Sequence, residues 1–200
     1  MSKSVFHTFL GKNTRSRTSQ TKELLRMKVY DKIIQTASKL FHNQGYNSTG
    51  INQIIAEAKV AKGSFYYNFN SKEAVCIAYL NARHDYWFDQ LKEYVQEQES
   101  TAPVILSAFD FLFLMNQKEN FRGCSFLNIL SEIPNDNTSI LTIIQNHKTD
   151  LRNYLSSLLE DPTVADHIYL LFESAIIESQ LFKNQWPIEK AKIITNSLIN

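Results

Sequence analysis

The sequence predicts an all-α protein, and three observations support this prediction. Only five Gly and four Pro occur in 200 residues, so few positions interrupt helices. Apolar side chains recur at three- and four-residue spacing along most of the chain, which is typical of amphipathic helices. The few Gly and Pro mostly stand at the ends of these periodic runs. With 44% hydrophobic residues, the chain can bury one sizeable core or a small domain joined to a larger one.

The first periodic run begins at Lys28 and predicts a helix that ends near Gln44, because Gly45 readily adopts the left-handed conformation found after helix C-termini. Its apolar positions are Ile33, Ile34, Ala37, Leu40 and Phe41. Residues 1–26, upstream, are rich in Ser, Thr and basic side chains and lack this periodicity. We interpret them as a flexible basic extension. It is either an arm that binds nucleic acid or a segment that precedes a natural start at Met27.

Two short helices should follow. Thr49 is expected to cap the first of them, whose apolar face includes Ile54 and Ala58. After a break at Lys59 and Val60, residues 61–69 predict the second. Three helices in about 45 residues, the last two joined by a tight turn, match the helix-turn-helix unit, here at about 50–69. We therefore expect a DNA-binding domain over 27–86.

A long fourth helix is expected after a cap at Asn70 or Ser71. Residues 87–200 then predict a second helical domain, in which Pro134, Pro162 and Pro187 separate the periodic runs. The expected helices cover 102–118, 124–133, 138–159, 164–183 and 187–199.

The charge distribution distinguishes the two halves of the chain. Residues 1–72 carry twelve Lys or Arg against three acidic residues, a net charge of +9, whereas the remaining 128 residues carry −8. This asymmetry indicates an N-terminal part that faces a polyanion and a C-terminal part that does not, although the basic extension supplies half of the positive charges.

The polar face of the third helix suits DNA. Its side chains are Lys62, Ser64, Tyr66, Tyr67 and Asn68, with no acidic residue among them. In a helix-turn-helix unit the last helix enters the major groove, where base edges distinguish all four base pairs. A merely solvated helix face could have a similar composition.

The segment LFHNQGYNSTGINQIIAEAKVAKGSFYYNFNSKEA closely resembles the DNA-binding domain of the TetR family of transcriptional regulators, over about a quarter of the chain. The resemblance implies a homodimeric repressor that a small hydrophobic effector releases from a palindromic double-stranded operator. It also implies DNA contacts at Thr49, Asn52, Lys62, Gly63, Ser64, Tyr66, Tyr67 and Lys72, and the positive charge of Lys59 predicts a further contact there.

One position departs from the family pattern. Lys59 stands where the turn between the second and third helices often has Gly. A non-Gly residue in the left-handed conformation costs about 1 kcal/mol, so the turn is either strained or shaped differently. The lysine adds positive charge at the DNA surface.

The resemblance places effector binding and dimerisation in 87–200. Aromatic side chains concentrate there, and although most aromatic residues are core residues, some are expected to border a hydrophobic pocket. The candidates are Trp87, Phe109, Phe113, Phe126, His147, Phe172 and Ile176. We expect the dimer to form through the last two helices, with Ile168, Ala175, Ser179, Ile188, Ala191 and Ile194 among the residues on their apolar faces.

Other function classes find little support. No HExxH, CxxC, GxGxxG, GxxxxGK[ST] or GxSxG motif occurs, so we expect neither an enzyme nor a bound metal or cofactor. No apolar run reaches the roughly 18 residues of a membrane span, and no signal segment is recognisable, which predicts a cytoplasmic protein. Cys76 and Cys124 are expected to be reduced thiols, with Cys124 the better candidate for a redox sensor.

Overall fold

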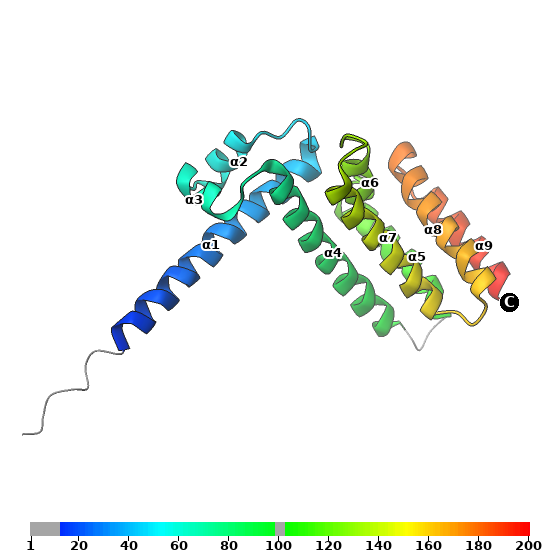
Figure 1. Ribbon diagram of the computed structural model, residues 1–200. Helices are drawn as coiled ribbons and strands as arrows, with labels where there is room; N and C mark the ends of the chain where they lie inside the picture. Colours follow the sequence, from blue (N-terminus) through cyan, green and yellow to red (C-terminus); the bar gives the residue numbers. More distant parts are fainter. Residues whose placement is uncertain (1–12, 99–102) are drawn as a thin grey trace, which may run out of the picture.

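The computed structural model describes residues 13–98 and 103–200, and side chains from Glu23 onward. Residues 1–12, part of the expected flexible extension, lie outside the described residues. Within the described ranges all regular structure is helical, which confirms the all-α prediction (Figure 1). The helices are α1 Asn13–Gln44, α2 Ile51–Ala58, α3 Lys62–Asn68, α4 Lys72–Glu97, α5 Val104–Lys118, α6 Ser125–Leu130, α7 Thr138–Ser157, α8 Pro162–Phe182 and α9 Trp186–Ile199.

Helix α1 is much longer than expected. It begins at Asn13, so the predicted start at Lys28 is wrong. The physical reason is that residues 22–27, with the sequence KELLRM, all have high helix propensity and continue the helix upstream without forming an apolar stripe. The C-terminal end was predicted correctly, because Gly45 follows Gln44 with φ of +93°.

The N-terminal core is built on α1, α2, α3 and the first half of α4. Ile33, Ile54, Phe65 and Val75 are fully buried in it, one from each helix. Phe65 is the only buried residue of α3. One apolar anchor thus fixes this short helix and leaves its other side chains on the surface.

The start of α2 differs from the prediction. Gly50 is the N-cap residue and provides no side-chain hydrogen bond. Thr49 is fully buried, and its hydroxyl donates to the Gly45 carbonyl at 2.7 Å. The expected cap at Thr49 is therefore wrong, because the hydroxyl closes the preceding loop instead of satisfying an N–H of α2.

Lys59, in the turn between α2 and α3, adopts the left-handed conformation. Lys59 has φ 53° and ψ 46°. Its N–H donates to the Ala56 carbonyl at 3.2 Å, and the Val60 N–H donates to the Ile55 carbonyl at 3.3 Å. This pair of bonds is the Schellman arrangement, usually built on Gly. The turn thus keeps the expected shape and carries the strain.

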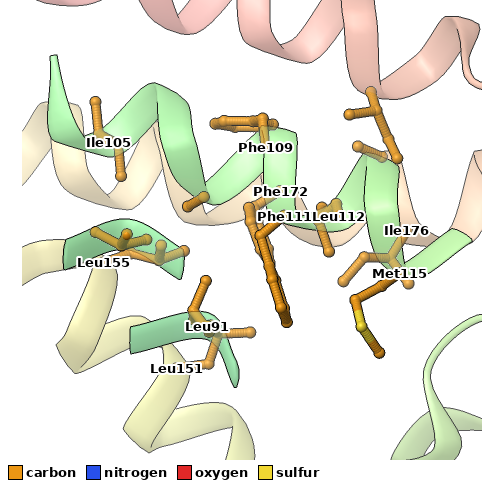
Figure 2. Packing of buried hydrophobic residues seen from close by; sticks show 14 of the residues in the cluster. Leu91, Ile105, Phe109, Phe111, Leu112, Met115, Leu151, Leu155, Phe172 and Ile176 are labelled. Carbon is orange, nitrogen blue, oxygen red and sulfur yellow. The ribbon is translucent and has the colours of Figure 1, made fainter. Parts of the chain in front are cut away.

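The C-terminal core lies among α4, α5, α7, α8 and α9. Figure 2 shows its aromatic centre, where Phe172 of α8 meets side chains of α5. The rings of Phe172 and Phe109 are 5.4 Å apart in an edge-to-face arrangement. Asp161 caps α8 through bonds to the Thr163 and Val164 N–H groups.

Helix α4 connects the two cores. Its residues up to Leu80 pack in the N-terminal core, and those from Trp87 onward pack in the C-terminal core. Phe126 and Ile129 of α6 pack with the N-terminal core, as does Ile140 at the start of α7. Movement in the C-terminal core can thus reach the N-terminal helices by two routes, α4 and α6. None of the helices in the described ranges is both long and apolar enough to cross a membrane.

Candidate nucleic-acid interface and ligand cavity

The outer face of α3 is polar and open. Tyr67 is 74% exposed, and Lys62 and Tyr66 are also exposed. The α3 segment, Lys62–Asn68, contains no acidic residue. Hydroxyl and ammonium groups on such a face can donate hydrogen bonds to phosphate oxygens and base edges.

Gly63 has no structural requirement within the chain. Its φ is not positive, and a Cβ added there would meet nothing within 4 Å. In contrast, a Cβ at Gly123 would lie 2.1 Å from the Gln180 side chain. The missing side chain at Gly63 therefore serves no internal packing, and it leaves room for close approach of another molecule.

The other residues predicted to contact DNA lie around α3. Asn52 on α2 and Lys59 in the turn are exposed, and Ser64 is half-buried. Lys72, also half-buried, places its ammonium 4.1 Å from the centre of the Tyr46 ring, and burial lowers its pKa. Thr49 faces inward, so its side chain is not part of this surface.

A small cavity of about 40 Å³ lies in the C-terminal part, among α4, α5, α7, α8 and the segment that leads into α6. Four of the seven predicted pocket residues line it: Trp87, Phe126, His147 and Ile176. Phe109, Phe113 and Phe172 do not. The first and last are fully buried core residues, and Phe113 packs against the same core.

The cavity also has polar walls that the aromatic pattern did not indicate. Arg83 and Glu119 line it and form an ion pair of 2.6 Å, with side chains only 15% and 14% exposed. Asn116 donates to the Ser179 hydroxyl at 2.9 Å. Lys148 pairs with Glu173 at 2.6 Å. One signal was available in the sequence, because Arg83 precedes Trp87 by one helical turn and so shares its face.

Comparison with known proteins places these features in a family. Residues 33–79 match the model of the family described as "Bacterial regulatory proteins, tetR family". Over 59 residues, 30% of this chain, the sequence is 48% identical to the HTH-type transcriptional regulator YuxN of Bacillus subtilis, covering 20% of that protein. Residues 33–79 thus belong to the TetR family of bacterial regulatory proteins. TetR regulators are DNA-binding proteins and not enzymes.

Similarity of fold extends further than similarity of sequence. A TetR-family regulator from Streptomyces coelicolor superposes with a TM-score of 0.78 at 20% identity, covering 95% of this chain and 96% of that one. The multidrug binding protein EbrR, complexed with malachite green, gives 0.70 at 16% identity, covering 86% and 98%. The first curated relatives are matched over only 20% to 54% of their own length. The TetR likeness in sequence is thus concentrated in the DNA-binding region.

His147 forms one wall of the cavity as a neutral ring. Its imidazole stacks on Phe126 at 3.6 Å, and its Nδ1 lies 3.1 Å from Nδ1 of His84, so one of these nitrogens donates and the other accepts. Burial, reinforced by the nearby positive charge of Lys148, lowers the pKa of His147 to about 2.

The two cysteines occupy different environments. Cys76 is buried in the N-terminal core, and burial raises the pKa of its thiol to about 12. Cys124 is half-buried and lines the cavity. A thiol that must ionise to react is therefore inert at Cys76. Among the described residues, no group of His, Cys, Asp and Glu side chains is arranged to hold a metal ion.

Polar contacts join the cavity region to the DNA-binding helices. Arg122, in the segment before α6, donates through Nε to the His42 carbonyl at the end of α1. The Asn47 N–H donates to the Glu132 carboxylate at 2.6 Å, and its side-chain amide donates to the Glu132 carbonyl at 2.8 Å. Asn120 and Phe121 beside Arg122 both have positive φ, so this segment carries strain.

Proposed function

We propose that this TetR regulator is a homodimeric repressor that binds a palindromic operator through α3 and is released by a small effector in the cavity. The open space at Gly63, within an exposed helix face free of acidic side chains, is the observation that carries the DNA-binding part. A protein that binds bacterial operators acts in the cytoplasm, so we propose that location.

The residues proposed to contact DNA divide by position. Lys62, Gly63, Ser64 and Tyr67 lie on α3 and approach base edges or adjacent phosphates. A second set surrounds them and contacts the sugar-phosphate backbone: Asn52, Lys59, Tyr66 and Lys72. Phosphate contacts fix the register of the helix, and base contacts supply the specificity.

The homodimer is proposed to form through α8 and α9, and of the residues that the sequence indicated only Ile194 is exposed enough to take part. Ile168, Ala175, Ser179, Ile188 and Ala191 are buried within the chain, so they are unavailable to a partner. The opposite faces of these helices expose large apolar side chains instead: Leu170, Ile177, Leu181 and Phe182 on α8, and Trp186, Ile193 and Ile194 on α9. Apolar surface of this extent is typical of an interaction site, and two-fold pairing would explain it.

The effector is proposed to bind among Trp87, Phe126, His147 and Ile176. These side chains offer aromatic and aliphatic contact, and the Arg83–Glu119 pair offers polar groups at the cavity wall. The fold neighbour EbrR binds malachite green, an aromatic compound, which supports an aromatic or hydrophobic effector for the same fold. A ligand that displaces the segment holding Arg122 would shift the end of α1 and so the separation of the two α3 helices.

The experiment that tests this proposal is selection of bound duplexes from a random DNA pool, followed by gel-shift titration and sedimentation of the complex. A palindromic consensus bound by a dimer is the expected result. Lys62→Ala and Tyr67→Ala should each weaken binding without changing helicity, whereas Lys92→Ala, at an exposed position of α4, should leave binding unchanged. If both α3 variants bound as tightly as the wild type, the assignment of α3 contacts would be wrong.

A thiol-operated signal is the second candidate, favoured by the position of Cys124 in the cavity wall. In that case mild peroxide treatment releases the operator, and Cys124→Ser abolishes the response while Cys76→Ser retains it. A response that both variants retain would eliminate this candidate.

A further inference from the structure

The N-terminal stretch of α1 extends beyond the helices of the DNA-binding region (Figure 1). From Glu23 to Lys28 every side chain is exposed, and among the described side chains of the helix, which begin at Glu23, the first buried one is Ile33. Leu24, Leu25 and Met27 are each more than half exposed. No described element therefore covers this stretch, and a helix of this length is only marginally stable in water on its own.

The C-terminal end of this stretch lies beside α3. A groove runs between the two helices, with Leu25, Arg26 and Val29 on the α1 side and Gly63, Ser64 and Tyr67 on the α3 side. The Arg26 guanidinium lies 5.6 Å from the centre of the Tyr67 ring. The stretch thus begins at the edge of the proposed base-reading surface.

Its charge is complementary to DNA. Between Asn13 and Lys28 the sequence contains five basic residues and a single acidic one, Glu23; the basic residues are Arg15, Arg17, Lys22, Arg26 and Lys28. At 1.5 Å per residue these sixteen residues span about 24 Å. Duplex DNA carries one negative charge for about every 1.7 Å of its axis, so a basic helix of this length can face several phosphates.

We propose that residues 13–28 of α1 form a second DNA-binding element, an arm that lies along the phosphates flanking the base pairs read by α3. This inference rests on the proposed DNA-binding function. Because the arm and α3 share a groove, DNA held by α3 is brought to the arm without rearrangement. The arm adds affinity and lengthens the protected duplex, and it carries no base specificity of its own.

The test uses the full-length chain and a duplex selected by the wild-type protein. The arm variant is Arg17→Gln/Lys22→Gln/Arg26→Gln. The control variant, Lys92→Gln/Lys118→Gln/Arg152→Gln, removes the same charge from exposed positions distant from α3. Binding is measured by fluorescence anisotropy at several salt concentrations, on duplexes with and without ten extra base pairs at each end.

We expect the arm variant to bind the long duplex at least about tenfold more weakly than the control at 0.15 M salt. The slope of log K against log salt should fall by about 0.9 for each phosphate that the arm variant no longer neutralises. Trimming the duplex ends should weaken the wild type and leave the arm variant unchanged, while both retain the same consensus.

Equal affinities and salt slopes for the arm and control variants would contradict the proposed role of the arm, even if α3 binds DNA as proposed. Failure of the proposed function would look different, because the wild type itself would then select no duplex. Circular dichroism and the thermal midpoint of each variant show whether a change in affinity comes from altered folding.

Discussion

The polar groups of the α3 surface and those of the cavity differ in how they are partnered. Within the described part of the chain, the Lys62 side chain makes no hydrogen bond or ion pair, and the Tyr67 ring has the Arg26 guanidinium 5.6 Å from its centre. In the cavity, Arg83 is paired with Glu119, and Lys148 with Glu173. The α3 surface is therefore ready for a partner without rearrangement, whereas a cavity ligand must compete with bonds that already exist.

The same contrast explains where sequence similarity is concentrated. The family model matches residues 33–79, although the fold is shared over 95% of the chain with the Streptomyces coelicolor regulator. A surface that must fit DNA restricts its residues directly. A cavity needs only a filled core around it, and many residue combinations fill a core equally well.

The largest expected effect is the difference in unfolding free energy between a core substitution and a surface substitution. Phe172→Ala removes a fully buried ring and should lower the free energy of unfolding by about 3–5 kcal/mol. Tyr67→Ala, at a position 74% exposed, should change it by less than about 0.5 kcal/mol. Urea titration followed by circular dichroism measures both, and similar losses in the two variants would contradict the division.

The Arg83–Glu119 ion pair in the cavity wall can be removed by substitution. Arg83→Met leaves the Glu119 carboxylate largely buried and without its partner, which should destabilise the protein by about 2–4 kcal/mol. Adding Glu119→Gln should recover a large part of this loss, because the unpaired charge is gone. A double-mutant cycle by thermal unfolding gives the coupling, and additive losses would show that the pair contributes nothing.

Acidification should weaken the C-terminal part through His147. Its folded-state pKa of about 2 lies far below the unfolded value of about 6.5, so below pH 6.5 only the unfolded chain takes up this proton. Stability from this group is complete above pH 6.5 and falls by about 2 kcal/mol between pH 7 and pH 5.

Urea titrations at both pH values measure this loss. His147→Gln should reduce the difference, and His167→Gln, at an exposed position, should not. An unaltered pH dependence in His147→Gln would contradict the assignment.

Gly63→Ala tests the proposed contact of the α3 surface with DNA. Because a Cβ there meets no protein atom, the substitution should leave stability unchanged or raise it by about 0.5–1 kcal/mol, since Ala favours helix over Gly. Affinity for the selected duplex should nevertheless fall about tenfold, because the methyl group occupies space required by DNA. Gel shift measures the affinity and thermal unfolding the stability of the same preparation. Loss of stability with unchanged affinity would show that Gly63 serves internal packing and not DNA binding.

The smallest effect is expected in the turn. Lys59→Gly relieves the left-handed strain and should stabilise the protein by up to about 1 kcal/mol, with Lys59→Ala as a control that retains the strain. Operator affinity at low salt should decrease slightly in both variants, because a positive charge is removed. A gain in stability for Ala equal to that for Gly would show that strain is not the cause.

Local signals in the sequence were sufficient for most helix ends. Gly45 ends α1, Ser71 caps α4 through the Ala74 N–H at 3.0 Å, and Pro187 lies in the first turn of α9. Each acts within a few residues, so its neighbours determine the outcome. The exposed face of α3 was also predictable, because Phe65 is its one buried anchor.

Features that depend on distant partners were not predictable in this way. Thr49 had two local options, and the loop geometry selected the Gly45 carbonyl. Phe109 and Phe126 both looked like pocket residues, but only the packing of α5 against α8 shows that Phe109 is core. The Arg83–Glu119 pair joins a residue of α4 to the C-cap residue of α5, 36 positions away, and no periodicity connects them.

The small volume of the cavity has a consequence for dose and response. A space of about 40 Å³ holds a few water molecules, whereas drug-sized ligands occupy pockets of about 300–1,000 Å³. A larger effector can bind only those molecules whose cavity has opened, so its apparent dissociation constant is the intrinsic one divided by the open fraction. For the proposed effector, tighter packing around Met115 and Ile176 would raise the concentration needed for a response (Figure 2). Substitutions there can retune that threshold without altering any contact with DNA.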